Sequence, residues 1–493
     1  MVRFAMPASR IPISLPIAAA LASLSLAACA PVPKLGPRPV PRDAASVASR
    51  ESLPQTPGAA WPGDGWWRSY GDPQLAALIE EGLRNSPDVA AAAARFRRAG
   101  GMAQEARGAT LPSLDLQGRA NLEKQSYNNG FPKEFVPKGW QDTGQIAASF
   151  GFDLDLWGKN RAALAAATSE ERAAAIDAQQ ARLVLATGIA SAYVDLSRLY
   201  DERDVYAAEL EVRSATQQLI SARSSNGLDT RGSLRQSDAE VAKARAELSV
   251  ADEAVALRRN QIAALVGAGP DRGLAIARPQ LPEPHATALP EGVTTDLVGR
   301  RPDIAAARAR VEAAASRIKV ARAAFFPAIR LSALVGVQSL GLENLIERDS
   351  TYGNAGPAIS LPIFRGGALQ GAYRSQRASF DEAVADYDRT VVAAYQDLAD
   401  TVTSQRMLLG RIGDARASLA ASEDAYHIAR KRYEGGLSTY LDVLTVQDRL
   451  LQARLIEADL NATAHRLRIA MIRALGGGFD AVTAASPKDG PHG

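Results

Sequence analysis

The sequence predicts a mixed α/β chain that is internally duplicated and built from pairs of short strands and very long helices. Three observations favour this fold class: motifs that recur at a nearly constant offset, four segments with apolar residues at every second position, and Pro-free segments with seven-residue apolar repeats. Strands place successive side chains on opposite faces, whereas sustained heptads are typical of coiled coils. We therefore expect strands and coiled-coil helices in both halves.

The motifs of the first half return in the same order in the second. The sequence NSPD at 85–88 returns as RRPD at 300–303, an offset of 215. Further along, Trp157 pairs with Phe364 at an offset of 207. Most of the change in offset falls between Pro112 and Trp157, which predicts a surface loop of different length in the two halves.

The N-terminus has the features of a secretory signal. Two Arg residues precede an almost wholly apolar stretch, 11–28, which ends in small residues. A basic start, a short apolar stretch and a small-residue site are typical of cleaved signals. A transmembrane anchor is the alternative, but Pro12 and Pro16 favour cleavage over a stable span of about 20 residues.

The residue after this segment is Cys29, the only Cys in 493 residues. An intramolecular disulfide is therefore excluded, and a single Cys in an exported chain needs another role. The sequence Leu26-Ala27-Ala28-Cys29 resembles a bacterial lipobox, which implies acylation of Cys29. In such lipoproteins Asp at the next position favours the inner membrane, so Ala30 implies export to the outer membrane.

Composition excludes several classes of function. Removing residues 1–28 lowers Lys plus Arg from 57 to 55 against 54 acidic residues, a net charge of +1, which is no footprint for nucleic acid. After residue 28 no apolar run approaches 18 residues, so the mature chain is expected to lack a transmembrane helix. If it crosses a membrane, it must do so as a closed barrel.

The order of segments follows from these patterns. We predict a signal peptide at 1–28, a lipidated Pro-rich tether at 29–62, repeats at 63–267 and 291–476 joined by a Pro-rich linker at 268–290, and a disordered tail at 477–493. Each repeat is expected to contain a helix, two strands and two long helices. The strands are expected near 111–122, 143–157, 327–338 and 353–364.

The four strand segments have the length and pattern of membrane strands. Each is about 10 residues long, which suits a tilted strand crossing a bilayer. Polar residues on the second face suit a watery lumen, although two soluble hairpins are an alternative. The smallest membrane barrels have about eight strands. Four strands per chain therefore predict a shared barrel, and three chains give a twelve-stranded transmembrane β-barrel. If the flanking helices stand in the periplasm, the loops near 123–142 and 339–352 face outside.

The helices are expected to be longer than in ordinary globular domains. Residues 160–224 contain no Pro, and Val241, Leu248, Val255 and Ile262 form a heptad seam. A 65-residue helix reaches roughly 100 Å. If these helices stand in the periplasm, those of three chains would continue the barrel as a long α-helical coiled-coil tunnel.

At this level of detail the chain resembles the TolC family, most closely its lipoprotein branch serving resistance–nodulation–division (RND) pumps. The motifs that carry the resemblance span nearly all of 60–478. They are Trp66-Trp67, Tyr70-Gly71-Asp72-Pro73-Gln74-Leu75, Asn85-Ser86-Pro87-Asp88, Asp155-Leu156-Trp157-Gly158, Arg300-Arg301-Pro302-Asp303 and Tyr440-Leu441-Asp442-Val443-Leu444. The resemblance implies a homotrimer in the outer membrane that works with a periplasmic adaptor (membrane fusion) protein and an inner-membrane RND pump to export drugs, metals or other small solutes.

The resemblance also implies functional sites at two helix–helix turns. Adaptor-docking tips would be Asn226-Gly227-Leu228 and Gly435-Gly436-Leu437, although Gly serves a tight turn in any protein. Tyr433 and Asp442 match residues that line the family's gate. Asp442 could equally be an ordinary carboxylate at a helix start. Ser233 stands where the family often has Asp, which puts a Tyr–carboxylate latch in doubt.

Enzymatic functions are disfavoured. The four His residues, at 285, 427, 465 and 492, are not spaced for a metal site, and no P-loop or nucleophile motif is present. We therefore expect no cofactor and no catalytic residue. The alternatives to efflux are the exit duct of a type I protein-secretion system and a non-channel periplasmic coiled-coil lipoprotein. The exported substrate cannot be read from this chain.

Overall fold

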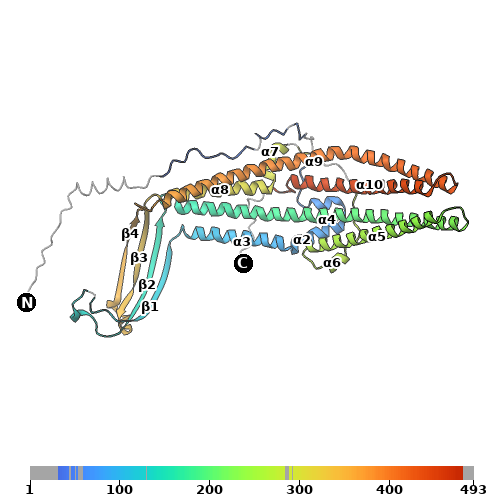
Figure 1. Ribbon diagram of the computed structural model, residues 1–493. Coiled ribbons are helices and arrows are strands. Elements are labelled where there is room, and N and C mark those ends of the chain that lie inside the picture. Colours follow the sequence, from blue (N-terminus) through green and yellow to red (C-terminus); the bar gives the residue numbers. More distant parts are fainter. Residues whose placement is uncertain are drawn as a thin grey trace, which may run out of the picture. The chain divides into compact units, whose positions relative to one another are not determined.

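The computed structural model describes residues 32–43, 46–49, 51–53, 59–128, 130–283, 288–290 and 292–480 (Figure 1). The predicted signal peptide and Cys29 lie outside these residues, as does the tail from 481 onward. None of the helices in the described part is long and apolar enough to span a membrane.

The three longest helices of each half repeat in order and in length. The described helices are α2 (Pro73–Asn85), α3 (Pro87–Gly108), α4 (Lys159–Ser225), α5 (Arg231–Leu265), α6 (Asp271–Leu274), α7 (Val293–Arg300), α8 (Pro302–Ala323), α9 (Ala368–Glu434) and α10 (Tyr440–Ala474). Helices α3 and α8 both have 22 residues, α4 and α9 both have 67, and α5 and α10 both have 35. The predicted internal duplication is therefore confirmed in the fold.

Four antiparallel strands form one sheet in the order β1-β2-β3-β4. They are β1 (Ser113–Glu123), β2 (Gln141–Leu154), β3 (Ala328–Leu340) and β4 (Thr351–Ser360). Strand β2 ends three residues before the predicted boundary because Asp155 turns the chain: its carboxylate accepts hydrogen bonds from the backbone N–H groups of Asn160 and Arg161. These bonds satisfy two free N–H groups at the start of α4.

The chain divides into two compact units. The first contains the sheet, with described residues 32–40, 98–171 (apart from 129) and 309–384. The second contains described residues of 41–97, 172–308 and 385–480. Helices α3, α4, α8 and α9 contribute residues to both units, whereas α5 and α10 lie in the second.

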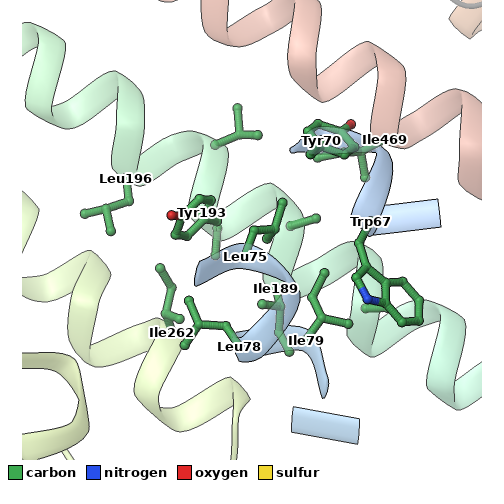
Figure 2. Close-up of a cluster of buried hydrophobic side chains, with 14 of the residues drawn as sticks. Trp67, Tyr70, Leu75, Leu78, Ile79, Ile189, Tyr193, Leu196, Ile262 and Ile469 are labelled. Carbon is green, nitrogen blue, oxygen red and sulfur yellow. The ribbon is translucent and has the colours of Figure 1, made fainter. Parts of the chain in front are cut away.

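The core of the second unit forms around α2. Asp72 caps this helix by accepting from the N–H groups of Gln74 and Leu75, and Tyr193 of α4 donates its hydroxyl to the same carboxylate at 2.7 Å. Leu75 and Ile189 belong to a cluster of buried hydrophobic side chains, which Figure 2 shows. Burial of each such side chain contributes about 1.5–3 kcal/mol, which fixes α2 against the long helices.

Candidate functional sites: a two-faced sheet and two helix–helix turns

The register of the sheet aligns apolar residues from all four strands on one face. Phe150 pairs with Leu114 on β1 and with Ala333 on β3, and Ala333 pairs with Ala355 on β4. Paired residues point to the same face of a sheet. The row through Ala148 likewise crosses all four strands, the row through Phe152 continues to Leu331 and Pro357, and the row through Ile146 continues to Val337. The pattern crosses strand pairs that are far apart in sequence, so this face is mainly apolar. Its polar exceptions, Asp142, Ser339 and Thr351, lie at the loop end of the sheet.

The opposite face carries polar groups in the same register. Arg119 pairs with Gln145, and Gln145 pairs with Gln338 and donates a short hydrogen bond to the hydroxyl of Tyr352. Next to the helices, the guanidinium of Arg330 lies 3.8 Å from the carboxylate of Asp153. A sheet with one apolar and one polar face can face lipid on one side and water on the other.

The two predicted tips are tight turns with the same geometry. In the first, Gly227 has φ 72° and the N–H of Leu228 donates to the carbonyl of Arg223 at 2.8 Å. In the second, Gly436 has φ 74°, and Leu437 bonds in the same way to Arg432 at 2.8 Å. This 6→1 bond after a left-handed Gly is a Schellman cap, so both glycines have a conformational role.

The remaining tip residues support these turns or face outward. The side chain of Asn226 donates to the carbonyl of Ala222 at 2.7 Å, and the N–H of Gly435 donates to that of Lys431 at 3.0 Å. Both tip leucines, 228 and 437, are exposed. A Cβ built on either left-handed glycine would meet no atom within 4 Å. The tips therefore offer open backbone and apolar side chains to a partner.

The helices that leave the two turns begin with matching caps. Thr230 accepts from the N–H of Ser233 at 3.0 Å, and Thr439 accepts from that of Asp442 at 3.4 Å. The carboxylate of Asp442 accepts in return from the N–H of Thr439 at 2.9 Å, which completes a capping box. This backbone bond, together with the Thr439 hydroxyl, lowers the pKa of Asp442. Within one chain, Asp442 thus serves the start of α10.

A second carboxylate, which the sequence analysis missed, joins the two turns. The hydroxyl of Tyr433 donates to Asp229 Oδ2 at 2.5 Å, and Asp229 Oδ1 accepts from the N–H of Thr230 at 2.8 Å. The guanidinium of Arg223 lies 5.1 Å from the Tyr433 ring centre and 3.9 Å from Asp229. Burial opposes ionisation of Asp229, but the bonds from Tyr433 and Thr230 outweigh it and lower its pKa. Burial and the bond to Asp229 raise the pKa of Tyr433.

The two turns carry their acidic residue at different positions. At the repeat offset of 209, Asp229 corresponds to Ser438 and Ser233 corresponds to Asp442. The Ser438 hydroxyl is buried and lacks a hydrogen-bond partner within the described part of the chain. Each turn therefore has one carboxylate, but only that of the first turn reaches the other turn.

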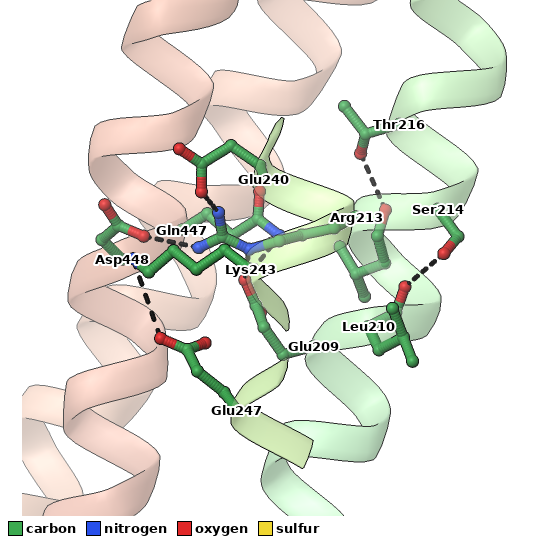
Figure 3. Close-up of polar contacts among 11 residues, drawn as sticks. Glu209, Leu210, Arg213, Ser214, Thr216, Glu240, Lys243, Glu247, Gln447 and Asp448 are labelled. Carbon is green, nitrogen blue, oxygen red and sulfur yellow. Dashed lines mark hydrogen bonds and ion pairs between the residues drawn. The ribbon is translucent and has the colours of Figure 1, made fainter. Parts of the chain in front are cut away.

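A buried charge cluster lies further along the same helices. Arg213 of α4 has a side chain only 2% exposed and bonds Glu209 on its own helix, Glu240 of α5 and Asp448 of α10 (Figure 3). Gln447 donates to Glu209 at 2.9 Å. Burial outweighs the bond from Arg213 and raises the pKa of Glu209. Three helices are thus tied by one guanidinium. Among the described residues no group of three or more His, Cys, Asp or Glu could hold a metal ion.

Comparison with known families gives one extensive match. A family model described as outer membrane efflux protein matches residues 78–268 and 294–477, which include both repeats. Fusaric acid resistance protein FusA of Burkholderia cepacia is 36% identical over 318 residues, which cover 63% of this chain and 59% of FusA. The pyoverdine export outer membrane protein OpmQ of Pseudomonas putida is 28% identical over 93% of this chain and 96% of its own length.

Solved structures agree with this match. The outer membrane protein VceC of Vibrio cholerae is 43% identical, with a TM-score of 0.80 over 85% of this chain and all of VceC. The outer-membrane channel OprN has the same fold, with a TM-score of 0.80 at 24% identity over 91% of this chain and 99% of its own.

Proposed function

The chain belongs to the outer membrane efflux protein family, and on that premise we propose that three copies close one twelve-stranded barrel across the outer membrane. The protein is an efflux component of the outer membrane and a passive channel, not an enzyme. The observation that carries the proposal is the register that gives the sheet one apolar and one polar face. Strands β1 and β4 are the outer strands of the sheet, so each is available to pair with a neighbouring copy.

Native mass spectrometry of the full-length protein in detergent tests this assembly. We expect a homotrimer. A stable monomer or dimer in a detergent that keeps the channel conducting would overturn the proposal.

We propose that Cys29 is acylated after removal of residues 1–28, which adds a lipid anchor to the barrel. Each buried lipid CH₂ contributes about 0.8 kcal/mol, so two or more acyl chains anchor the protein firmly in the membrane. Intact-mass analysis should find the lipid, and an unmodified thiol or a retained Met1 would contradict it. Cys29→Ser should release or mislocalise the chain, while trimer formation need not depend on it.

We propose small solutes as the exported class and an inner-membrane RND pump with a periplasmic adaptor as partners. The support is that FusA and OpmQ are named for fusaric acid resistance and pyoverdine export, both concerning small molecules rather than proteins. Accumulation of drugs, fusaric acid and pyoverdine in cells with and without the gene tests the substrate class. Unchanged accumulation, with a defect confined to a secreted protein, would favour a type I secretion duct instead.

We propose that the two turns close the periplasmic end in the resting state. Tyr433, held by Asp229, would keep the ends of α4 and α9 together in each chain. Asp442 is exposed, so its three copies in a trimer would form a ring of carboxylates that attracts cations. Asp442→Ala should then weaken block by divalent cations in planar bilayers. Channels that respond to divalent cations like wild type would leave Asp442 only its role in the capping box.

A further inference from the structure

The two connections at the helix-distant end of the sheet differ in length and charge. Residues 124–140 join β1 to β2, whereas 341–350 join β3 to β4 (Figure 1). The longer loop accounts for the change in repeat offset. It carries three Lys and one Glu, while the shorter carries three acidic residues and one Arg. The insertion thus places positive charge at this end of the sheet, and channel assembly as proposed above does not use it.

The longer loop has a defined internal structure. A 3-10 turn spans Lys133–Phe135, closed by the N–H of Phe135 donating to the carbonyl of Pro132 at 3.0 Å. The Tyr127 hydroxyl accepts from the N–H of Gly139 at 3.1 Å, which joins the two arms of the loop. Val136 is buried, whereas the preceding Phe135 is exposed. These contacts order the described residues of the loop, 124–128 and 130–140.

The side chains that this arrangement leaves outside are large aromatics and lysines. Phe131, Phe135 and Trp140 are 68%, 80% and 65% exposed. Lys124, Lys133 and Lys138 are also exposed, and none of them forms an ion pair within the described part of the chain. Aromatic rings interleaved with Lys suit a membrane–water interface, because the rings enter the headgroup level and the ammonium groups reach phosphates.

The position of Trp140 fits that level. It directly precedes β2 and has the even-numbered parity of Ile146 and Phe150. Asp142 has the same parity, and its carboxylate accepts a hydrogen bond from the N–H of Leu342 at 3.0 Å, so the apolar face ends in a polar residue next to Trp140. Strand β2 has 14 residues. At about 3.3 Å per residue and a tilt of about 40° it rises roughly 35 Å, which exceeds the roughly 30 Å hydrocarbon core. A residue just beyond its end therefore lies among headgroups.

We propose that residues 124–140 dock on the anionic, phosphate-bearing lipid headgroups of the membrane surface, with Lys124, Lys133 and Lys138 facing the phosphates. This inference rests on the proposed membrane insertion of the sheet. The other occupant to consider is the acidic 341–350 loop of a second copy. A second copy would lie beside the outer strands β1 and β4, in line with the sheet. Trp140 instead adjoins β2, an inner strand, on the side of its apolar face.

The test uses the full-length protein in phosphatidylcholine vesicles with increasing amounts of brominated phosphatidylglycerol. The signal is the fluorescence of wild type minus that of Trp140→Phe, which isolates Trp140. We expect strong quenching, and we expect each Lys→Gln change to raise the half-saturating fraction of anionic lipid about fivefold. The control replaces Arg406, Arg411 and Lys431, exposed cations of α9, with Gln and should behave as wild type.

Each alternative has a distinct outcome. Absence of quenching, or equal half-saturation in the wild-type protein and the triple Lys→Gln variant, would overturn the inference. If quenching were absent from wild type and appeared only after the acidic residues of 341–350 were replaced, the loop would be assigned to a second copy. Native mass spectrometry and vesicle flotation of the same samples report assembly and insertion separately. Failure there contradicts the proposed function, whereas failure of the lipid response alone contradicts only this inference.

Discussion

The hydroxyl of Tyr433, at the end of α9, donates a 2.5 Å hydrogen bond to Asp229, which lies 204 residues earlier in the turn after α4. Arg223 completes the group, with its guanidinium 5.1 Å from the Tyr433 ring centre. A hydrogen bond to a charged group contributes about 1.5–3 kcal/mol. This contact therefore holds the ends of the two longest helices together in one chain.

Tyr433→Phe should loosen the turns while leaving the fold intact. The ring remains to pack against its neighbours, and only the bond to Asp229 is lost. We expect higher single-channel conductance or more frequent opening in planar bilayers, and greater susceptibility of cells to large antibiotics. Tyr440→Phe is the control, because its ring lies 6.2 Å from that of Tyr433 but its hydroxyl does not bond Asp229. Equal effects of the two variants would contradict a specific role for this bond.

The effect of Tyr433→Phe should be independent of pH over the physiological range. The pKa of Asp229 is lowered below its ordinary value of about 3.9. A carboxylate whose pKa is lowered by folding contributes its full stabilisation at pH values above its ordinary pKa. That stabilisation disappears as the pH falls through the lowered pKa of the folded state. The difference in opening between wild type and Tyr433→Phe should thus stay constant from about pH 5 to 8 and narrow only below about pH 4. Conductance measured at a series of pH values and fixed salt gives this difference. If the difference changed near pH 6, another group would control the turns.

The sequence predicted the two-faced strands because their alternation is a local pattern. It predicted the duplication because its motifs recur at a nearly constant offset. Period-2 alternation over β1–β4 specifies which side chains share a face, and the 215 and 209 offsets specify equivalent helices. The end of β2 was placed too late, because the alternation continues through Leu156 while the Asp155 carboxylate already caps α4. Side-chain capping of this kind competes with strand pairing and leaves no trace in hydrophobic periodicity.

The Tyr433 partner could not be predicted for a different reason. The family resemblance directs attention to Ser233, where the family often has Asp, and suggests that the first turn lacks a suitable carboxylate. The carboxylate lies four residues earlier, at Asp229, where the second repeat has Ser438. Only the packing of the two turns brings Asp229 to Tyr433. The exposed aromatics of 124–140 were likewise apparent in the sequence only as a difference in loop length.

Charge on the apolar face of the sheet should prevent assembly, whereas charge on the polar face should not. Phe152 pairs with Leu331 on the apolar face, and Gln117 lies on the polar face opposite Ala147. Phe152→Asp exposes a carboxylate to lipid, at up to a few kcal/mol per chain. Three copies multiply that cost, so we expect little trimer by native mass spectrometry. Gln117→Asp is the matched control, and similar trimer yields from both variants would contradict the assignment of faces.

Removing the buried guanidinium of Arg213 should destabilise the helices strongly. Arg213→Met keeps the apolar stem but leaves Glu209 and Glu240 without their cation, and breaking a buried ion pair in this way costs about 3–5 kcal/mol. We expect a lower melting temperature, measured by circular dichroism of the trimer. Arg235→Met is the control, because that Arg is mostly exposed and pairs only with Asp238 on its own helix. An unchanged melting temperature for Arg213→Met would mean that the cluster adds no net stability.

Substitution at Gly436 separates the two roles suggested for the tips. Its φ of 74° favours Gly or Asn, and a Cβ there would meet no atom within 4 Å. Gly436→Asn should therefore preserve the turn, the trimer and conductance. If the tip docks an adaptor through its open backbone, the added side chain should still abolish drug resistance in cells.

Gly436→Ala is the complementary variant. Its side chain is smaller than that of Asn, but Ala strains the left-handed turn by about 1–2 kcal/mol. Loss of trimer stability with Ala but not with Asn indicates a conformational role. Loss of resistance with Asn at full trimer yield indicates docking, since only an external partner can detect a side chain that fits the turn. Full resistance in both variants would exclude close backbone contact at Gly436, and adaptor docking would then have to use the exposed side chains of Leu228 and Leu437 alone.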